Sequence, residues 1–185
     1  MPAFYLTFLA VLLAGFGARD QVTIAALSKR QGGRPGILVV ALLSALATAV
    51  FAAFAAHWML GELPPPARTI FAAIALGMAG GESLLLAPRR EFREPTHSLG
   101  ALLIVLLAHQ VTDAARFIVF GMGVGMGAPL ASGAAGLLGG AVLVCLAWAM
   151  PAWLGQPLQR WIRRLSGAVL LCVAGYLLLS QMHIV

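Results

Sequence analysis

Long apolar runs separated by short polar turns dominate the chain. The hydrocarbon core of a bilayer requires about 20 apolar residues per transmembrane helix, and six stretches reach approximately that length. The charged or proline-rich turns between them, such as residues 29–36 and 61–66, cannot continue an apolar helix. The pattern predicts an all-α polytopic membrane protein with six transmembrane helices, approximately over residues 3–27, 37–60, 69–87, 99–121, 133–154 and 165–182.

The composition supports this prediction and disfavours the soluble classes. Hydrophobic residues make up 61% of the chain and charged residues 10%, whereas about a quarter of a soluble domain is charged. A net charge of +6 could indicate nucleic acid or anionic lipid. Because the positive residues fall in short loops, we expect the lipid bilayer as partner and no nucleic acid. Cys145 and Cys172 lie in apolar runs, and their spacing matches neither a disulfide framework nor a metal-binding motif.

The positive loop residues fall on one side of the predicted bundle. Loops one, three and five carry three each, whereas Arg68 stands alone on the other side. The positive-inside rule then puts both termini outside the cytoplasm, and the absence of targeting tracts favours a bacterial inner membrane. No Lys or Arg precedes the first apolar run, which disfavours a cleaved signal peptide. The loop residues are Lys29, Arg30, Arg34, Arg89, Arg90, Arg93, Arg160, Arg163 and Arg164.

The chain repeats itself at a spacing of 94 to 95 residues, which divides it into residues 1–94 and 95–185. Each unit contains three spans, an odd number, so the second unit should enter the membrane inverted relative to the first. Inverted repeats are a recurrent plan of secondary transporters, with the substrate site near the midplane between the halves. A duplicated but purely structural membrane protein is the alternative. The matching segments are Val11–Ala14 with Val105–Ala108, and Ala79–Gly80 with Ala174–Gly175.

Charged and polar residues interrupt three of the apolar spans. An ionised group in hydrocarbon costs roughly 2.5–3.5 kcal/mol on insertion scales, so such groups usually have a partner or a function. In a continuous helix His109, Asp113 and Arg116 would share one face. The pattern predicts a polar cavity for a cation or protons, or else ion pairs that only pin the halves together. The pathway candidates are Asp20, Gln21, Glu82, His109, Gln110, Thr112 and Asp113, with Arg19 and Arg116 as charge partners.

A family resemblance follows from the polar motifs of the first and fourth spans. Six spans in two inverted halves, with an acidic motif in each, resemble the Golgi-type calcium/manganese–proton exchanger family, the Gdt-one group, which includes bacterial manganese exporters. That family carries E-x-G-D-[KR]-[ST] twice. In the first half Gly15 and Ala18 replace its glutamate and aspartate, and Asp20 occupies the Ser/Thr position. The positions that match are Gly17, Arg19 and the following Gln21.

The second motif admits two alignments. Aligned on the aspartate, residues 110–115 keep Asp113, and aligned by the repeat, His109 takes the glutamate position. The resemblance implies a divalent cation–proton antiporter for manganese or calcium, with Asp20 and Asp113 as candidate metal ligands. The family pattern supplies four acids, whereas this chain keeps one by position plus the displaced Asp20. The motifs therefore support membership of this family better than they support the family's transport activity.

Two other functions stay open at this point. Arg19 and Arg116 could bind a different solute, such as an anion or an amino acid, or the protein could be a non-transporting membrane scaffold. We expect no enzyme activity and no resident cofactor, because no catalytic constellation such as HExxH occurs. The expected ligand is a small inorganic cation or a proton, and a homo-oligomer is possible.

Overall fold

The computed structural model of the chain describes residues 1–85, 98–154 and 157–182, and the described part is almost entirely helical. The predicted all-α class is therefore confirmed. Prolines begin several of the helices, as expected for a residue with a helical φ and no N–H to pair. The elements are α1 (Pro2–Gly15), α2 (Arg19–Arg30), α3 (Pro35–Glu62), α4 (Pro65–Leu85), α5 (Leu99–Val111), α6 (Ala114–Gly125), α7 (Pro129–Ala149), the 3₁₀ turn η1 (Pro151–Trp153) and α8 (Pro157–Gln181).

Within the described residues, four helices are long and apolar enough to cross a membrane: α3, α4, α7 and α8. Two further pairs pass the same test only together, and each pair is bent at a short break. The α1–α2 pair bends by 60° and the α5–α6 pair by 51°. The chain is thus an integral membrane protein, with up to six spans if each bent pair crosses as one.

The two breaks correct the prediction of continuous first and fourth helices. In the first, Gly17 has a φ of +80°, a conformation that glycine adopts without the strain of a Cβ. In the second, Asp113 has an extended backbone and caps the start of α6. Both breaks coincide with the polar motifs, because polar side chains can pair the backbone groups that a break leaves free.

The fifth predicted loop is also corrected. Residues 159–164 belong to α8, which begins at Pro157 and not near Leu165. Arg163 is only 4% exposed, so it is no loop charge, whereas Arg160 and Arg164 are exposed. The expected loop residues Arg89, Arg90 and Arg93 lie outside the described residues.

The packing reverses the size pattern of a soluble bundle. On α3 the buried side chains are mostly small, including Ala41, Ser44 and Ala45, while large ones such as Phe51 and Phe54 are exposed. Small side chains let transmembrane helices approach closely where burial offers no hydrophobic gain. One close approach joins α4 to α8, where a Cβ on Gly80 would lie 2.8 Å from the carbonyl oxygen of Gly167.

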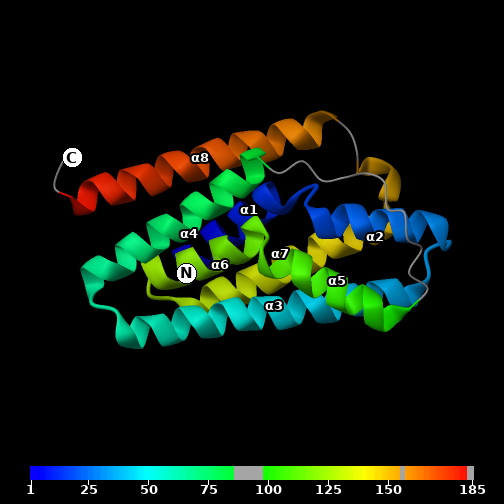
Figure 1. Cartoon of the computed structure of the whole chain (residues 1–185), viewed down its shortest axis with the longest axis horizontal. Helices are drawn as coiled ribbons and strands as arrows, with labels where there is room; N and C mark the ends of the chain where they lie inside the picture. The colour runs from blue at the N-terminus through cyan, green and yellow to red at the C-terminus, as the bar shows by residue number, and fades with distance from the viewer. Residues whose placement is uncertain (86–97, 155–156, 183–185) are drawn as a thin grey trace.

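The helices lie roughly along one long axis (Figure 1). The α1–α2 pair runs from left to right in that view, and the α5–α6 pair runs back from right to left. Helix α3 packs against α7 and also against both members of the α5–α6 pair, while α7 packs against both members of the α1–α2 pair. Helix α4 packs against α8. This arrangement brings the two breaks together in the interior of the bundle.

Candidate functional site

Side-chain hydrogen bonds to the backbone stabilise the break between α1 and α2. Gln21, which is 3% exposed, accepts a bond from the backbone N–H of Gly17 and donates one to the carbonyl of Gly15. Arg163 of α8 donates to the carbonyl of Gly17. The free backbone groups of this break are therefore paired by one residue of its own half and one of the other.

The break between α5 and α6 is paired in a related way. The carboxylate of Asp113 accepts from the backbone N–H of Ala115, as an N-cap does. Arg19, from the first half of the chain, donates to both the carbonyl and the hydroxyl of Thr112, the C-cap of α5. Each half thus supplies an arginine to the break of the other half.

Each half-helix that starts at a break carries an aspartate at its N-terminus. Asp20 lies in the first turn of α2, and Asp113 caps α6. A helix N-terminus bears a partial positive charge that favours a nearby carboxylate. Both side chains are nearly buried, at 9% and 5% exposed. The fold therefore offers two carboxylates where each is stabilised by its own helix.

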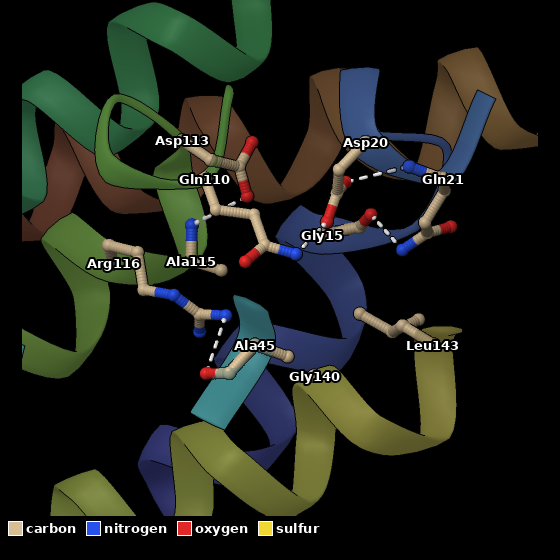
Figure 2. Close-up of a pocket in the computed structure, with 10 residues that line it drawn as sticks. All are labelled: Gly15, Asp20, Gln21, Ala45, Gln110, Asp113, Ala115, Arg116, Gly140 and Leu143. Carbon is tan, nitrogen blue, oxygen red and sulfur yellow. Dashed lines mark hydrogen bonds between the residues drawn. The ribbon is translucent and has the colours of Figure 1, made fainter. Parts of the chain in front are cut away.

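The two aspartates line one small cavity between the halves of the chain (Figure 2). Its volume is about 10 Å³, which is close to the space that one water molecule needs. Figure 2 shows the carboxylates of Asp20 and Asp113 and the guanidinium of Arg116 around the same space. The full lining is Gly15, Asp20, Gln21, Ala45, Gln110, Asp113, Ala115, Arg116, Gly140 and Leu143.

A hydrogen-bonded chain connects Arg116 to Asp20 across four helices. Arg116 donates from Nε to the hydroxyl of Thr48 on α3 (2.8 Å), and that hydroxyl donates to Oε1 of Gln110 on α5 (3.1 Å). The amide of Gln110 then donates to Oδ2 of Asp20 (3.0 Å). Such buried networks fix geometry, because each member left unpaired is costly. The network orients Asp20 and Arg116 without direct contact between them.

Glu82 forms a second charged group beside the cavity. Both of its carboxylate oxygens lie 2.6 Å from Nη2 of Arg163, and Nε of Arg19 lies 3.9 Å from one of them. Arg163 also bonds to the first break and Arg19 to the second. Through these two arginines, Glu82 connects α4 to both breaks. With Asp20, Asp113 and Arg116 included, three acids and three arginines are gathered in the interior.

The structure gathers some predicted site residues and separates others. Asp20, Gln21, Gln110, Asp113 and Arg116 line the cavity. The shared face expected for His109, Asp113 and Arg116 is wrong, because the helix ends at Val111 and restarts in a new direction at Ala114. The remaining candidates lie outside the lining: His109 is half-buried, Thr112 and Arg19 meet at the second break, and Glu82 pairs with Arg163.

Two residues of the site were missed from the sequence. Arg163 resembled a loop charge, although it lies four residues before the buried Gly167 and so on the same face of α8. Thr48 lies in an apolar run where a lone threonine usually bonds its own helix backbone, and here the carbonyl of Ser44, 2.9 Å away, competes with Gln110 for the single proton of its hydroxyl. Its second role, toward Arg116 and Gln110, depends on tertiary contacts alone.

The site offers few ligands for a divalent metal. Among the described residues, no three or more His, Cys, Asp or Glu side chains are grouped as a metal would need. Metal binding by Asp20 and Asp113 therefore stays a prediction. Comparison with known proteins adds no further constraint: no family model, no curated protein and no solved structure matches the chain.

Proposed function

We propose that the protein is a secondary transporter that exchanges a small cation for protons through the cavity between its halves. One observation carries the proposal: two broken spans each present an aspartate, at the start of a half-helix, to the same cavity. Broken helices at the middle of the membrane commonly form the ion sites of secondary transporters. Carboxylates kept inside a membrane usually mark an ion or proton pathway.

The inverted repeat and six spans belong to the same proposal. The N-caps of α2 and α6 are Ala18 and Asp113, and their separation matches the 94-to-95-residue repeat. Helix α7 contacts both members of the first bent pair and α3 contacts both members of the second, and α7 also contacts α6. The matched caps favour the alignment of the second motif on Asp113 over the alignment on His109. The resemblance to the calcium/manganese–proton exchangers is proposed on the same correspondence.

The proposed topology is that both termini face away from the cytoplasm of a bacterial cell. Positive residues gather at the end of the bundle where α2 ends and α3 and α8 begin (Figure 1). With Arg163 removed from the count, the described ones there are Lys29, Arg30, Arg34, Arg160 and Arg164, against Arg68 at the opposite end. The positive-inside rule makes the richer end cytoplasmic.

The test is ion flux in proteoliposomes that contain the purified protein. An imposed proton gradient should drive cation movement, and replacing both Asp20 and Asp113 with asparagine should abolish it, because the site then loses its charges. The matched control is Glu62→Gln, which removes an exposed carboxylate at the end of α3. Proton-independent flux, or flux unchanged by the double replacement, would reject the proposal.

The same assay separates the two rival functions. Arg116 has no carboxylate within 4 Å among the described residues, which favours a transporter whose arginine binds an anionic solute. In that case solute binding would survive the two asparagine replacements and be lost in Arg116→Gln. A scaffold held together by the Glu82–Arg163 pair would move no solute in any variant.

A further inference from the structure

Arg19 is a partly exposed charge at the level of the two helix breaks. It begins α2 at the first break, and its guanidinium bonds to Thr112 at the second. The Arg19 side chain is 29% exposed, and Thr112 is exposed as well. The other two arginines beside the cavity, Arg116 and Arg163, are only 6% and 4% exposed. Of these three charges, Arg19 is therefore the one that meets the medium around the protein.

The medium beside Arg19 has to be water, because an ionised side chain that faces hydrocarbon is costly. A long side chain near a helix end escapes this cost by reaching toward the interface, but Arg19 is too far from one. From Arg19, α2 continues to Arg30 at the positively charged end of the bundle, about 17 Å at 1.5 Å per residue. That distance exceeds the length of an arginine side chain, and the two bonds to Thr112 hold the guanidinium at the break.

A partly exposed stripe connects Arg19 with the positively charged end of the bundle. Val22, Ala26 and Lys29 follow Arg19 on α2 at the spacing of one helix face, and none of them is buried. The neighbouring Ala25 is only 5% exposed, so the exposure is confined to this face. This α2 stripe, residues 19, 22, 26 and 29, offers a surface along which water can reach the break.

In the opposite half of the bundle, the polar side chains between α1 and α7 are buried. Thr7 of α1 donates to the hydroxyl of Ser132 on α7, and both residues are 0% exposed. The two helices are close together here, since a Cβ on Gly139 would lie 2.9 Å from a methyl group of Val11. Helix α6, which packs against both, buries eight of its 12 residues. Packing this close excludes water from the half of the bundle that contains α1 and α6.

We propose that the structure is the inward-open state of the transporter: water enters from the cytoplasm along the α2 stripe as far as Arg19 and Thr112, while the outer half is closed. Arg19 and Asp20 are consecutive, and Asp20 lines the cavity. Ions in this state reach the cavity from the cytoplasmic side. The inference rests on the proposed function and topology, and it assigns the face of the membrane from which the site is loaded.

The rate of cysteine modification shows which of these surfaces meet water. The thiolate is the reactive form, and an apolar environment suppresses it. In a background without Cys145 and Cys172, Val22→Cys and Thr112→Cys report on the proposed entrance, and Ser132→Cys reports on the outer half. A sulfonated methanethiosulfonate that cannot cross membranes is applied to spheroplasts and to inverted vesicles. Unreacted thiols are then counted by a gel shift with a polyethylene-glycol maleimide.

Two further single-cysteine variants are matched controls. Ala25→Cys lies on the buried face of α2, beside the stripe. Val111→Cys precedes Thr112 but lies about 100° away around the helix, on the face that we expect to contact lipid. Both should react slowly from either side, because neither thiol meets water.

In inverted vesicles, Val22→Cys and Thr112→Cys should react about tenfold faster than the two controls or more, since each unit by which an apolar environment raises a thiol pKa lowers the thiolate fraction about tenfold. In spheroplasts both should be slow. Ser132→Cys should be slow in both preparations. Val22 is an independent test of the entrance, because its side chain has no polar group to lose if the missing Thr112 hydroxyl disturbs the second break.

Three results would overturn the inward-open assignment: entrance cysteines that react no faster than the controls, entrance cysteines that react faster in spheroplasts, or Ser132→Cys as reactive as Thr112→Cys. None of them depends on a transported ion, so each leaves the proton-driven flux in proteoliposomes to be judged separately. The proposed function would fail in the converse case, when the labelling pattern is as expected and no flux is found.

Discussion

Glu82→Gln should destabilise the folded protein by about 3–5 kcal/mol, the usual cost of breaking a buried ion pair by removing one partner. Glu82 and Arg163 are 8% and 4% exposed and bonded through both carboxylate oxygens. Glutamine keeps the shape but not the charge, so Arg163 would be left buried without compensation. The loss should appear as a lower free energy of unfolding, measured by steric trapping in bicelles.

Two further variants show whether the effect belongs to the pair. Glu62→Gln, at an exposed position, should change stability by less than about 0.5 kcal/mol, as surface substitutions usually do. Adding Arg163→Gln to Glu82→Gln should recover much of the loss, because the buried charge of Arg163 is then removed as well. Equal effects at positions 82 and 62, or strictly additive losses in the double variant, would refute the role given to this pair.

Gln21→Leu should destabilise the protein by about 1–3 kcal/mol, the usual cost of a backbone group left unpaired inside a protein. That group is the N–H of Gly17, which Gln21 now joins to the carbonyl of Gly15 across the break. Leucine fills similar space but cannot pair the N–H of Gly17, whereas the carbonyl of Gly15 keeps the N–H of Ala18 as a partner. Hydrogen–deuterium exchange should rise over residues 15–18 and stay unchanged in the middle of α3.

The matched replacement is Gln181→Leu at the end of α8, where the side chain is half-buried and spans no break. It should leave both the stability and the exchange of residues 15–18 unaltered. If Gln21→Leu behaves like Gln181→Leu, the break is not held by the Gln21 side chain, and the account of how the first bent span is stabilised is wrong.

The sequence predicted the helical class and the residues that interrupt the apolar spans, because apolar length and isolated charges are local properties. It did not predict the breaks themselves. Gly17 and Asp113 signal a break only if the polar side chains around them find backbone partners, and those partners come from distant segments. Arg19 meets Thr112 across 93 positions of sequence, and Arg163 meets Gly17 across 146.

The sequence also did not predict which charges of the site pair with each other. Arg163 lies in a basic stretch between the fifth and sixth apolar segments, a position that by itself indicates a loop. Its burial results from the close approach of α4 and α8 at Gly80 and Gly167, which brings Arg163 to Glu82. The sequence therefore assigned Glu82 to the pathway with no partner named. Only the tertiary packing divides the acids into one paired group and one cavity group.

The central claim is that both helix breaks lie at the middle of the bilayer, and the depth of spin labels beside them tests it most directly. Leu13 and Val111 flank the two breaks, and both are exposed on the outer surface, at 43% and 45%. Each would be replaced by cysteine and labelled after removal of the exposed Cys145 and Cys172. Labels at Trp58 and Leu158, exposed residues near helix ends, give the interfacial reference.

We expect the labels at 13 and 111 to collide freely with oxygen, to be shielded from a water-soluble nickel chelate, and to lie within about one helical turn (5.4 Å) of the same depth near the bilayer centre. Labels at 58 and 158 should show the opposite preference. Nickel accessibility at 13 or 111 equal to that of the reference labels would place the breaks in water, and the proposed ion pathway could not exist.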